Sequence, residues 1–563
     1  MSKVVLLAVN SKYVHSALSV WLLAEGVSMY AHKPHDVEII EATIHQQDSD
    51  IAAMITAHKP DVVGISTYIW NASKLPGLLK LLREQLPRCI FVLGGPEASY
   101  NVDYWLANGA DYVVHGEGER QFPVLLDELA NKKTQPENRR GGILPPAGNV
   151  LYNPGRQDAA PTTAKPINGD FHIKHPPDPY SQVYISTLKN RLAYLETSRG
   201  CPYSCAFCLS GESKLQFFPI ETAKEQMYKL SKSGAKTIKL IDRTFNSNPM
   251  RAYELFEYVI SLETTCCFHF EVAADLFDER TIKLLSTAPP GRVQFEAGLQ
   301  SYHEPTLKAI TRKSDLTKAD ANIKALLTPG NIHIHVDLIA GLPYETLSIF
   351  TNSFNRAYAL GAHDLQLGFL KLLHGSTLRK QAEVLGIQYH QAPPYEIISS
   401  PWLSSGDIIT LKQTENALRH THNKSRFLST IKYVLSATGL SPFALFQKLG
   451  GYHENHGLPL ETYAQMVHDC FLAIPGVGKD ELQSRMICDW LTMVRGKNMP
   501  GFLRKPDTKR KQIISTIEKK IGRTIGREEV AFLPSGEHVF VDVNDRDIVT
   551  GLYKITAQPR HNF

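Results

Sequence analysis

The sequence has no apolar run that approaches the about 18 consecutive apolar residues needed to cross a membrane. Its start, MSKVVLLAVNSKY, has only a short apolar run before Asn10 and no small-residue cleavage site, so it predicts a first strand rather than a signal peptide. A net charge of +5 over 563 residues is too small to indicate a nucleic-acid or membrane partner. We therefore expect a cytoplasmic protein without a membrane partner.

Cysteine is scarce, with eight residues in the whole chain. Three of them, Cys201, Cys205 and Cys208, nevertheless fall within eight positions. In a reducing compartment such a group binds metal or performs redox chemistry more often than it forms disulfides. Four others lie at a strand start or in apolar helical stretches, where burial as small apolar side chains is expected: Cys266, Cys267, Cys470 and Cys488.

Short β-branched runs alternate with helical patterns over residues 1–130, which predicts an α/β, doubly wound, Rossmann-like domain with a parallel sheet. Ligands of such sheets bind at the carboxyl ends of the strands. The polar and glycine residues expected at those ends are Asn10-Ser11, Ser66-Thr67, Gly94-Gly95-Pro96 and Gly116-Glu117-Gly118-Glu119.

Three further regions follow along the chain. Residues 131–185 are rich in proline and polar residues and predict a linker. Residues 186–392 contain six strand–helix patterns, which predict a partial (β/α)6 barrel of the TIM type with polar residues at the strand ends. Residues 393–563 predict a mainly helical carboxyl-terminal domain of unknown role, with a hairpin over residues 529–543.

The three clustered cysteines have the spacing C-x3-C-x2-C directly after a predicted strand. Three thiolates on one loop can hold three irons of a 4Fe–4S cluster and leave the fourth iron open to an external ligand. A structural zinc site needs four protein ligands, and the nearest candidates, His175 and Cys266, are far along the chain. We therefore favour the cluster, with zinc or three core cysteines as the alternatives.

This triplet, with the aromatic Phe207 before its last cysteine, resembles the signature of the radical S-adenosylmethionine (SAM) superfamily. The resemblance implies that the open iron chelates SAM and that the reduced cluster cleaves it to a 5′-deoxyadenosyl radical. An electron donor such as a flavodoxin or ferredoxin would then be a partner.

The resemblance extends to the predicted barrel, where IDRTFN (241–246), FEAGLQS and DLIAGLPYET are similar to SAM-contacting strand ends of that superfamily. The alternative is that these residues are polar groups satisfied within the protein, or residues that shape turns, such as Gly341 and Pro343. The expected SAM-binding residues are Phe207, Asp242, Glu271, Gln300, Arg312 and Asp337, with Glu296 and Ser301 at the same strand ends.

A doubly wound domain before this barrel resembles the cobalamin-binding domain of many radical SAM enzymes, and VHGEGERQFPVLLDEL is similar to the end of that domain. The resemblance implies cobalamin binding by Ser66, Thr67, Gly94, Gly95, Glu117 and Gly118. The alternative is a strand-end loop that binds a nucleotide or nothing. The D-x-H-x-x-G motif of histidine-ligated cobalamin is absent, and His15 lacks its flanking Asp and Gly. We therefore expect no histidine lower ligand.

The combined resemblance, to uncharacterised bacterial cobalamin-dependent radical SAM proteins, implies methylation of an unactivated carbon of an unknown substrate. Alternatives are cyclisation or rearrangement without methyl transfer, and a non-catalytic corrinoid-binding or sensory protein. A methylthiotransferase would need three further amino-terminal cysteines, and only Cys89 lies there. His374 and Tyr302 are expected either to line the barrel mouth or to pack.

Basic residues are concentrated in residues 503–523. We expect them to form a solvent-exposed helix face, and the alternative is a site for a phosphate-bearing partner such as tRNA. The basic residues of this segment are Arg504, Lys505, Lys509, Arg510, Lys511, Lys519, Lys520 and Arg523.

Overall fold

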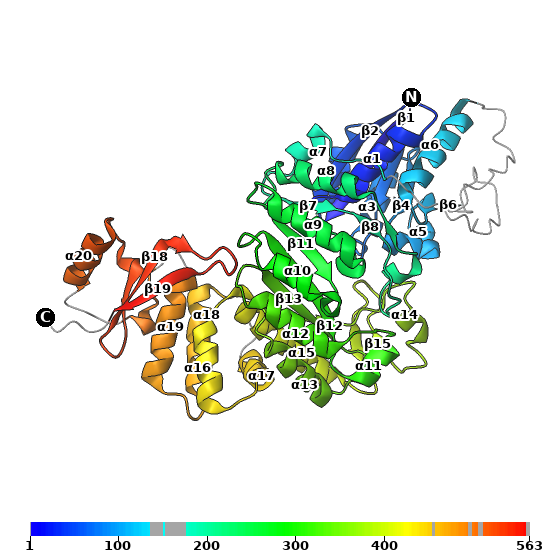
Figure 1. The fold of residues 1–563 in the computed structure, drawn as a ribbon. Coiled ribbons are helices and arrows are strands. Elements are labelled where there is room, and N and C mark those ends of the chain that lie inside the picture. Colours follow the sequence, from blue (N-terminus) through cyan, green and yellow to red (C-terminus); the bar gives the residue numbers. More distant parts are fainter. Residues whose placement is uncertain are drawn as a thin grey trace. The chain divides into compact units, whose positions relative to one another are not determined.

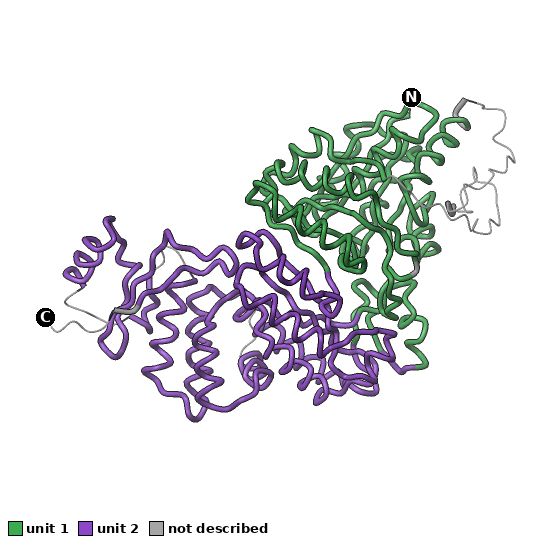
Figure 2. Tube along the Cα trace, in the orientation of Figure 1, with its two compact units in different colours: residues 1–271, 371–384, 388–397 green, residues 272–370, 385–387, 398–563 purple. Residues whose placement is uncertain are grey.

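The computed structural model describes residues 2–134, 150–152, 176–452, 457–493, 498–504 and 510–558 (Figure 1). The chain divides into two compact units (Figure 2): residues 1–271, 371–384 and 388–397 form the first, and residues 272–370, 385–387 and 398–563 form the second. In the described part of the chain, no helix has the length and apolar character needed to cross a membrane.

The first unit contains a six-stranded sheet with the order β2-β1-β3-β4-β5-β6. The first five strands pair in parallel, and β6 joins β5 antiparallel at the edge. The strands are β1 (Ser2–Asn10), β2 (His35–Thr43), β3 (Val62–Ser66), β4 (Ile90–Gly94), β5 (Tyr112–Val114) and β6 (Val150–Tyr152).

Helices cover both faces of this sheet because alternate residues of β1 face opposite ways. Val5 and Leu7 pack into one apolar cluster with Leu78 of α3, whereas Leu6 packs into another with Phe122 of α6. This arrangement confirms the predicted doubly wound class. The helices are α1 (Leu18–Tyr30), α2 (Asp48–Thr56), α3 (Leu75–Gln85), α4 (Pro96–Ser99), α5 (Val102–Ala107) and α6 (Gly118–Thr134).

A second six-stranded sheet has the order β14-β13-β12-β11-β10-β7, and alternation with helices confirms the predicted partial barrel. Its strands are β7 (Leu192–Leu195), β10 (Thr237–Leu240), β11 (Cys267–Val272), β12 (Val293–Gln300), β13 (His333–Ala340) and β14 (Asp364–Phe369). The intervening helices are α8 (Ile220–Ser231), α9 (Pro249–Ser261), α10 (Glu279–Leu285), α11 (Glu304–Ala309), α12 (Leu316–Leu327) and α13 (Leu347–Tyr358).

Shorter elements connect these layers: α7 (Gln182–Ser186), β8 (Ser198–Arg199), β9 (Gln216–Phe217), α14 (Thr377–Gln381), β15 (Gln388–Tyr389) and β16 (Ile397–Ser399). Most of the predicted linker, together with His175, lies outside the described residues. The domain boundaries expected from the sequence stay predictions.

The carboxyl-terminal part is mainly helical, as predicted, and ends in a three-stranded antiparallel sheet rather than a simple hairpin. The sequence analysis did not predict the third strand, although Tyr553, Ile555 and Ala557 alternate with polar residues in β19. The elements are α15 (Ser405–His420), α16 (Leu428–Thr438), α17 (Pro442–Tyr452), α18 (Leu460–Leu472), α19 (Lys479–Met493), α20 (Arg510–Ile521), β17 (Val530–Phe532), β18 (His538–Arg546) and β19 (Tyr553–Gln558).

Candidate functional site

The cysteine loop begins directly after β8 and is folded by two glycines. Gly200 has φ +86°, and a Cβ there would lie 2.6 Å from the Lys214 carbonyl oxygen. A Cβ on Gly211 would lie 2.3 Å from the Tyr203 carbonyl oxygen. Only glycine fits at both positions, so the local sequence lets the loop fold back on itself.

The three thiols have an environment that suits a metal cluster. Cys205 is buried, whereas Cys201 and Cys208 are partly exposed, and none forms a disulfide. The Ser210 N–H donates to Cys208 Sγ at 3.4 Å, and Cys201 Sγ lies 3.5 Å from Thr244 Oγ1. Three thiolates from one loop can hold three corners of a 4Fe–4S cluster.

The other cysteines have the properties of packed thiols. Burial raises the pKa of Cys89 to about 12 and the pKa values of Cys470 and Cys488 to about 11. Cys266 is buried, and its thiol donates to the Ala235 carbonyl oxygen at 2.9 Å. Thiols with a raised pKa, such as those of Cys89, Cys470 and Cys488, are poor metal ligands.

Arg199, immediately before the cysteine loop, is the centre of a charged network that the sequence analysis missed. Its guanidinium lies 2.7 Å from Glu196 and Glu119 and 3.3 Å from Glu117. Glu119 is nearly buried, with 9% of its side chain exposed. The network joins β8 to the start of α6, so Glu117 holds a protein partner whether or not it contacts cobalamin. No local pattern reveals a contact between residues 80 positions apart.

Asp242 follows β10 and anchors the strand that leads into the cysteine loop. Its carboxylate is buried and accepts hydrogen bonds from the Thr197 N–H at 2.9 Å, the Thr197 hydroxyl at 2.7 Å and the Ser198 hydroxyl at 2.6 Å. Burial raises the pKa of Asp242 to about 6 despite these bonds. The contact of Asp242 with SAM stays a prediction, and its hydrogen bonds show a positioning role.

Glu271 of β11 lies in a loose cluster of charges at the strand end. Its carboxylate is 3.6 Å from Lys239 Nζ and 3.7 Å from an Arg243 guanidinium nitrogen. At these distances the ion pairs are weak, so the Glu271 carboxylate is held only loosely by its neighbours. Phe207 is partly exposed in the turn between Cys205 and Cys208.

Three of the expected SAM-binding residues in the second unit meet at the end of β12. Gln300 has a backbone φ of +70°. Its side-chain Nε2 lies against Gly298, because a Cβ on Gly298 would be only 2.3 Å from that nitrogen. Arg312 donates to the Gly298 carbonyl, and Asp337 is the register partner of Gly298 on β13. Gln300 Oε1 is buried and has no hydrogen-bond partner among the described residues. A buried unpaired acceptor beside a guanidinium fits a bound polar ligand such as SAM.

Ser301, next to Gln300, has a structural partner instead. Its hydroxyl donates to Glu345 Oε1 at 2.5 Å, and the Ser353 hydroxyl donates to the same oxygen at 3.1 Å. Burial raises the pKa of Glu345 to about 7.

At the end of β3, Ser66 and Thr67 are buried and make only long hydrogen bonds to carbonyls of their own sheet, at 3.5 and 3.4 Å. A Cβ on Gly95, which has φ +99°, would lie 2.7 Å from the Thr67 carbonyl oxygen, and a Cβ on Gly118 would meet Leu23 at 2.9 Å. Packing therefore explains these two glycines. Gly94 makes only ordinary contacts, and cobalamin binding by this set stays a prediction.

The same strand end presents an aromatic pair that the sequence analysis did not single out. Tyr68 and Trp70 stack with ring centroids 4.3 Å apart, and 43% of Trp70 is exposed. His15 is held by the barrel, since its Nδ1 lies 2.5 Å from the Tyr194 hydroxyl.

His374 and Tyr302 have packing contacts. His374 lies edge-on to Tyr395, and burial lowers the pKa of its imidazole to about 4. The Tyr302 hydroxyl donates to Asp320 at 2.6 Å beneath the guanidinium of Arg356.

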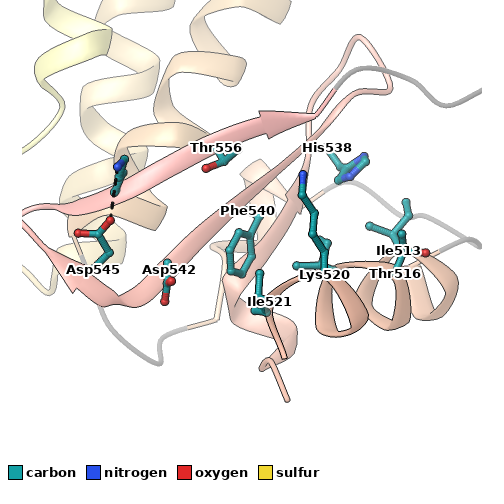
Figure 3. Close-up of a pocket in the computed structure, with 11 residues that line it drawn as sticks. Ile513, Thr516, Lys520, Ile521, His538, Phe540, Asp542, Asp545 and Thr556 are labelled. Carbon is teal, nitrogen blue, oxygen red and sulfur yellow. Dashed lines mark ion pairs between the residues drawn. The ribbon is translucent and has the colours of Figure 1, made fainter. Parts of the chain in front are cut away.

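A separate groove of about 280 Å³ lies between α20 and the terminal sheet (Figure 3). Lys520, His538 and Phe540 line it, and none of the expected cofactor-binding residues does. Two residues of the basic segment are used within this domain: Arg523 pairs with Glu529 at 2.6 Å, and Arg510 lies over the Phe532 ring. Lys505 and Lys509 lie outside the described residues.

Three family models match successive parts of the chain. The B12 binding domain matches residues 4–126, the Radical SAM superfamily matches residues 195–357, and a protein family of unknown function (DUF4080) matches residues 383–530.

Curated relatives match this chain over only part of their own length. The 2-(S-pantetheinyl)-carbapenam-3-carboxylate methyltransferase of Streptantibioticus cattleyicolor is 25% identical over 62% of this chain and 52% of its own. The cobalamin-dependent radical SAM methyltransferase TokK of Streptomyces tokunonensis is 23% identical over 76% and 64%. The anaerobic magnesium-protoporphyrin IX monomethyl ester cyclase of Rubrivivax gelatinosus is 23% identical over 57% and 58%. The chain thus spans about half to two thirds of these relatives.

The fold is similar to that of two solved enzymes. The methyltransferase TsrM from Kitasatospora setae, with cobalamin and a [4Fe-4S] cluster bound, has a TM-score of 0.53 and 16% identity over 84% of this chain and 100% of its own. The radical enzyme OxsB with aqua-cobalamin bound has a TM-score of 0.57 and 13% identity over 86% and 78%. The chain therefore carries a Radical SAM superfamily domain, which contains the cysteine triplet, preceded by a B12 binding domain.

Proposed function

We propose that this protein is a cobalamin-dependent radical SAM methyltransferase that acts on an unactivated carbon. The observation that supports it most is that a B12-binding domain and the cysteine loop belong to one compact unit and are joined by the Arg199 network. When bound, the cluster and SAM supply a carbon radical on the substrate, and cobalamin supplies the methyl group.

The residues of the chain have separate tasks in this proposal. Cys201, Cys205 and Cys208 hold the cluster, and the Ser210 N–H bond to Cys208 Sγ stabilises the thiolate. Asp242 fixes the strand before the loop through Thr197 and Ser198, without contact to the cluster.

The SAM-binding groups of the second unit are Gln300, Arg312 and Asp337. Gln300 Oε1 is the acceptor for an ammonium or ribose hydroxyl donor, and the Arg312 guanidinium binds a carboxylate. In the first unit Glu271, held loosely by Lys239 and Arg243, accepts from the same class of donor. Phe207 supplies an apolar contact from the turn of the cysteine loop.

Cobalamin binding involves the carboxyl ends of β3 and β4 and the start of α6, where Ser66, Thr67, Gly94, Gly95, Glu117 and Gly118 lie. The long hydrogen bonds of Ser66 and Thr67 leave their hydroxyl groups available to amide side chains of the corrin ring. Lower ligation by His15 is disfavoured because His15 lacks the preceding Asp and the following Gly of the D-x-H-x-x-G motif.

Cyclisation without methyl transfer is the second candidate, because one relative is a cyclase. The proposed electron donor is a flavodoxin or ferredoxin, and the proposed location is the cytoplasm. A nucleic-acid substrate is disfavoured because Arg510 and Arg523 of the basic segment have protein partners.

The test uses the full chain, reconstituted anaerobically with iron, sulfide and cobalamin, and incubated with a reductant, cell extract and SAM that carries a trideuterated methyl group. Methylation predicts 5′-deoxyadenosine and a trideuteromethyl product. If 5′-deoxyadenosine forms while no label reaches any product, cyclisation is favoured. If cobalamin binds and no 5′-deoxyadenosine forms, the protein is a non-catalytic corrinoid binder.

A further inference from the structure

The amino ends of β13 and β14 hold a group of metal-ligating side chains that the proposed function does not use. His333 and His335 are two positions apart on β13, so their side chains face the same side of the sheet. Asp364 begins β14 and is the register partner of His335. All three residues belong to the second unit.

The ligand atoms of these three residues converge. One imidazole nitrogen of each histidine and one carboxylate oxygen of Asp364 all lie within 4.8 Å of one another. His335 Nε2 is 3.0 Å from Asp364 Oδ2, and the rings of His333 and His335 are 4.8 Å apart. All three side chains are partly buried. Among the described residues, this is the one group of three metal-ligating side chains that close together.

A fourth ligand is present at the same place. The side-chain amide of Gln294, on β12, lies 2.8 Å from His335 Nε2. Since the oxygen and nitrogen of an amide exchange by a rotation about the last side-chain bond, Gln294 Oε1 can point to the centre of the group.

The surroundings of His333 are those of an oriented ligand. His363 stacks on its ring at 4.6 Å, and the Ile334 N–H donates to His363 Nδ1 at 3.2 Å, which places the His363 proton on Nε2. Asp547, in the turn between β18 and β19, interacts electrostatically with His363. Stacking against a ring that is itself held by a hydrogen bond restricts the orientation of the His333 imidazole.

We propose that His333, His335 and Asp364, with Gln294, bind a divalent first-row transition ion of the Zn2+ class. Two imidazoles and one carboxylate form a donor set that these ions prefer over Ca2+ or Mg2+. The site lies at the amino ends of the strands, where barrel residues serve stability rather than chemistry. Its role is therefore to link β12, β13 and β14.

The probe is Co2+, titrated anaerobically into the full chain in which Cys201→Ala, Cys205→Ala and Cys208→Ala remove the cluster ligands. We expect visible d–d absorption that saturates at about one equivalent of Co2+, and competition by Zn2+. His335→Ala in this background abolishes the band, and His363→Ala weakens Co2+ binding by about 10–100-fold. The control His58→Ala, an exposed histidine of the first unit, keeps the full band.

Asp364→Asn keeps the volume of the side chain, so it replaces His335→Ala as the test variant if circular dichroism shows that His335→Ala does not fold. We expect Asp364→Asn to remove the Co2+ band as well. A background protein that gives no saturable Co2+ band, or an Asp364→Asn variant that keeps it, overturns the proposal and leaves a hydrogen-bonded ion pair only.

Discussion

The cysteine loop and the end of β12 differ in how their polar groups are satisfied. Around the loop, Arg199 has three carboxylate partners and Asp242 accepts three hydrogen bonds. At the end of β12, Gln300 Oε1 is buried without a partner, and Glu345 Oε2 is also buried and unpaired among the described residues.

This difference matches two kinds of binding site: the cysteine loop would hold a resident cluster, and the end of β12 would bind a diffusible ligand. A metal cluster needs thiolates held in fixed positions, and most of the polar groups around them are satisfied by the protein itself. The exception is Glu117 Oε2, which is buried and has no hydrogen-bond partner among the described residues. A diffusible ligand needs groups that it can satisfy, and an acceptor left unpaired costs about 1–3 kcal/mol until the ligand binds. The comparison can be tested from the largest expected effect to the smallest.

Removal of one cluster ligand should have the largest effect. Cys208→Ala should lose the cluster, and SAM cleavage should fall by at least about 10³-fold because no open iron remains. Iron analysis, electron paramagnetic resonance and 5′-deoxyadenosine formation check this result. Cys267→Ala, outside the triplet, is the matched control and should keep its iron. A Cys208→Ala protein with wild-type iron content would contradict the assignment.

Arg199→Ala should destabilise the first unit by about 3–5 kcal/mol, because it leaves nearly buried carboxylates uncompensated. Arg199→Lys should recover only part of this loss, since one ammonium cannot replace the planar fork. Urea unfolding of the cluster-free proteins measures the effect. The exposed pair of Arg485 and Glu481 is the control, and Arg485→Ala should change stability by less than about 1 kcal/mol. If Arg199→Ala and Arg485→Ala lowered the free energy of unfolding equally, the Arg199 network would stabilise the protein no more than an exposed ion pair does.

Glu345 should make stability depend on pH. Burial raises its pKa from 4.5 to about 7, so the folded state holds the proton more tightly than the unfolded state. Its contribution is therefore complete below about pH 4.5 and is lost as the pH rises through about 7, with up to about 3 kcal/mol at stake. Glu345→Gln removes this titration, so its stability relative to wild type should rise across that range. If the urea midpoints of wild type and Glu345→Gln changed in parallel from pH 5 to pH 8, the titration of Glu345 would not contribute to stability.

Gln300→Ala should weaken SAM binding by about tenfold, the equivalent of about 1.4 kcal/mol, without lowering stability. An unpaired buried acceptor destabilises the free protein, so its removal should not lower the free energy of unfolding. Equilibrium SAM binding and thermal unfolding of the reconstituted protein separate the two effects. Gln85→Ala, on the exposed face of α3, is the control. A loss of stability with unchanged SAM affinity would make Gln300 a structural residue.

His15→Ala should have the smallest effect on cobalamin. The electron paramagnetic resonance spectrum of the cob(II)alamin form should show no nitrogen splitting from the protein, in wild type or variant, because the D-x-H-x-x-G motif of histidine-ligated cobalamin is absent. Protein-derived splitting that disappears in His15→Ala would identify His15 as the lower ligand.

Local patterns predicted the fold class and the triplet well. Strands β1 and β3 carry β-branched runs, and the spacing of Cys201, Cys205 and Cys208 places three thiolates on one loop without any tertiary information. The third strand of the terminal sheet, β19, was not predicted, although Tyr553, Ile555 and Ala557 alternate with polar residues there. The pattern also assigned Asp242 to a ligand without revealing the hydrogen bonds to Thr197 and Ser198.

The sequence by itself determined which chemical groups are present and how they are spaced along the chain: three thiolates on one loop, and glycines at the ends of strands. Contacts between distant residues were decided only by the tertiary structure. Arg199 meets Glu119 across 80 positions, and His335 meets Asp364 because β13 and β14 pair in parallel. Periodicity and spacing report on neighbours along the chain, whereas burial and charge pairing depend on which segments the fold brings together.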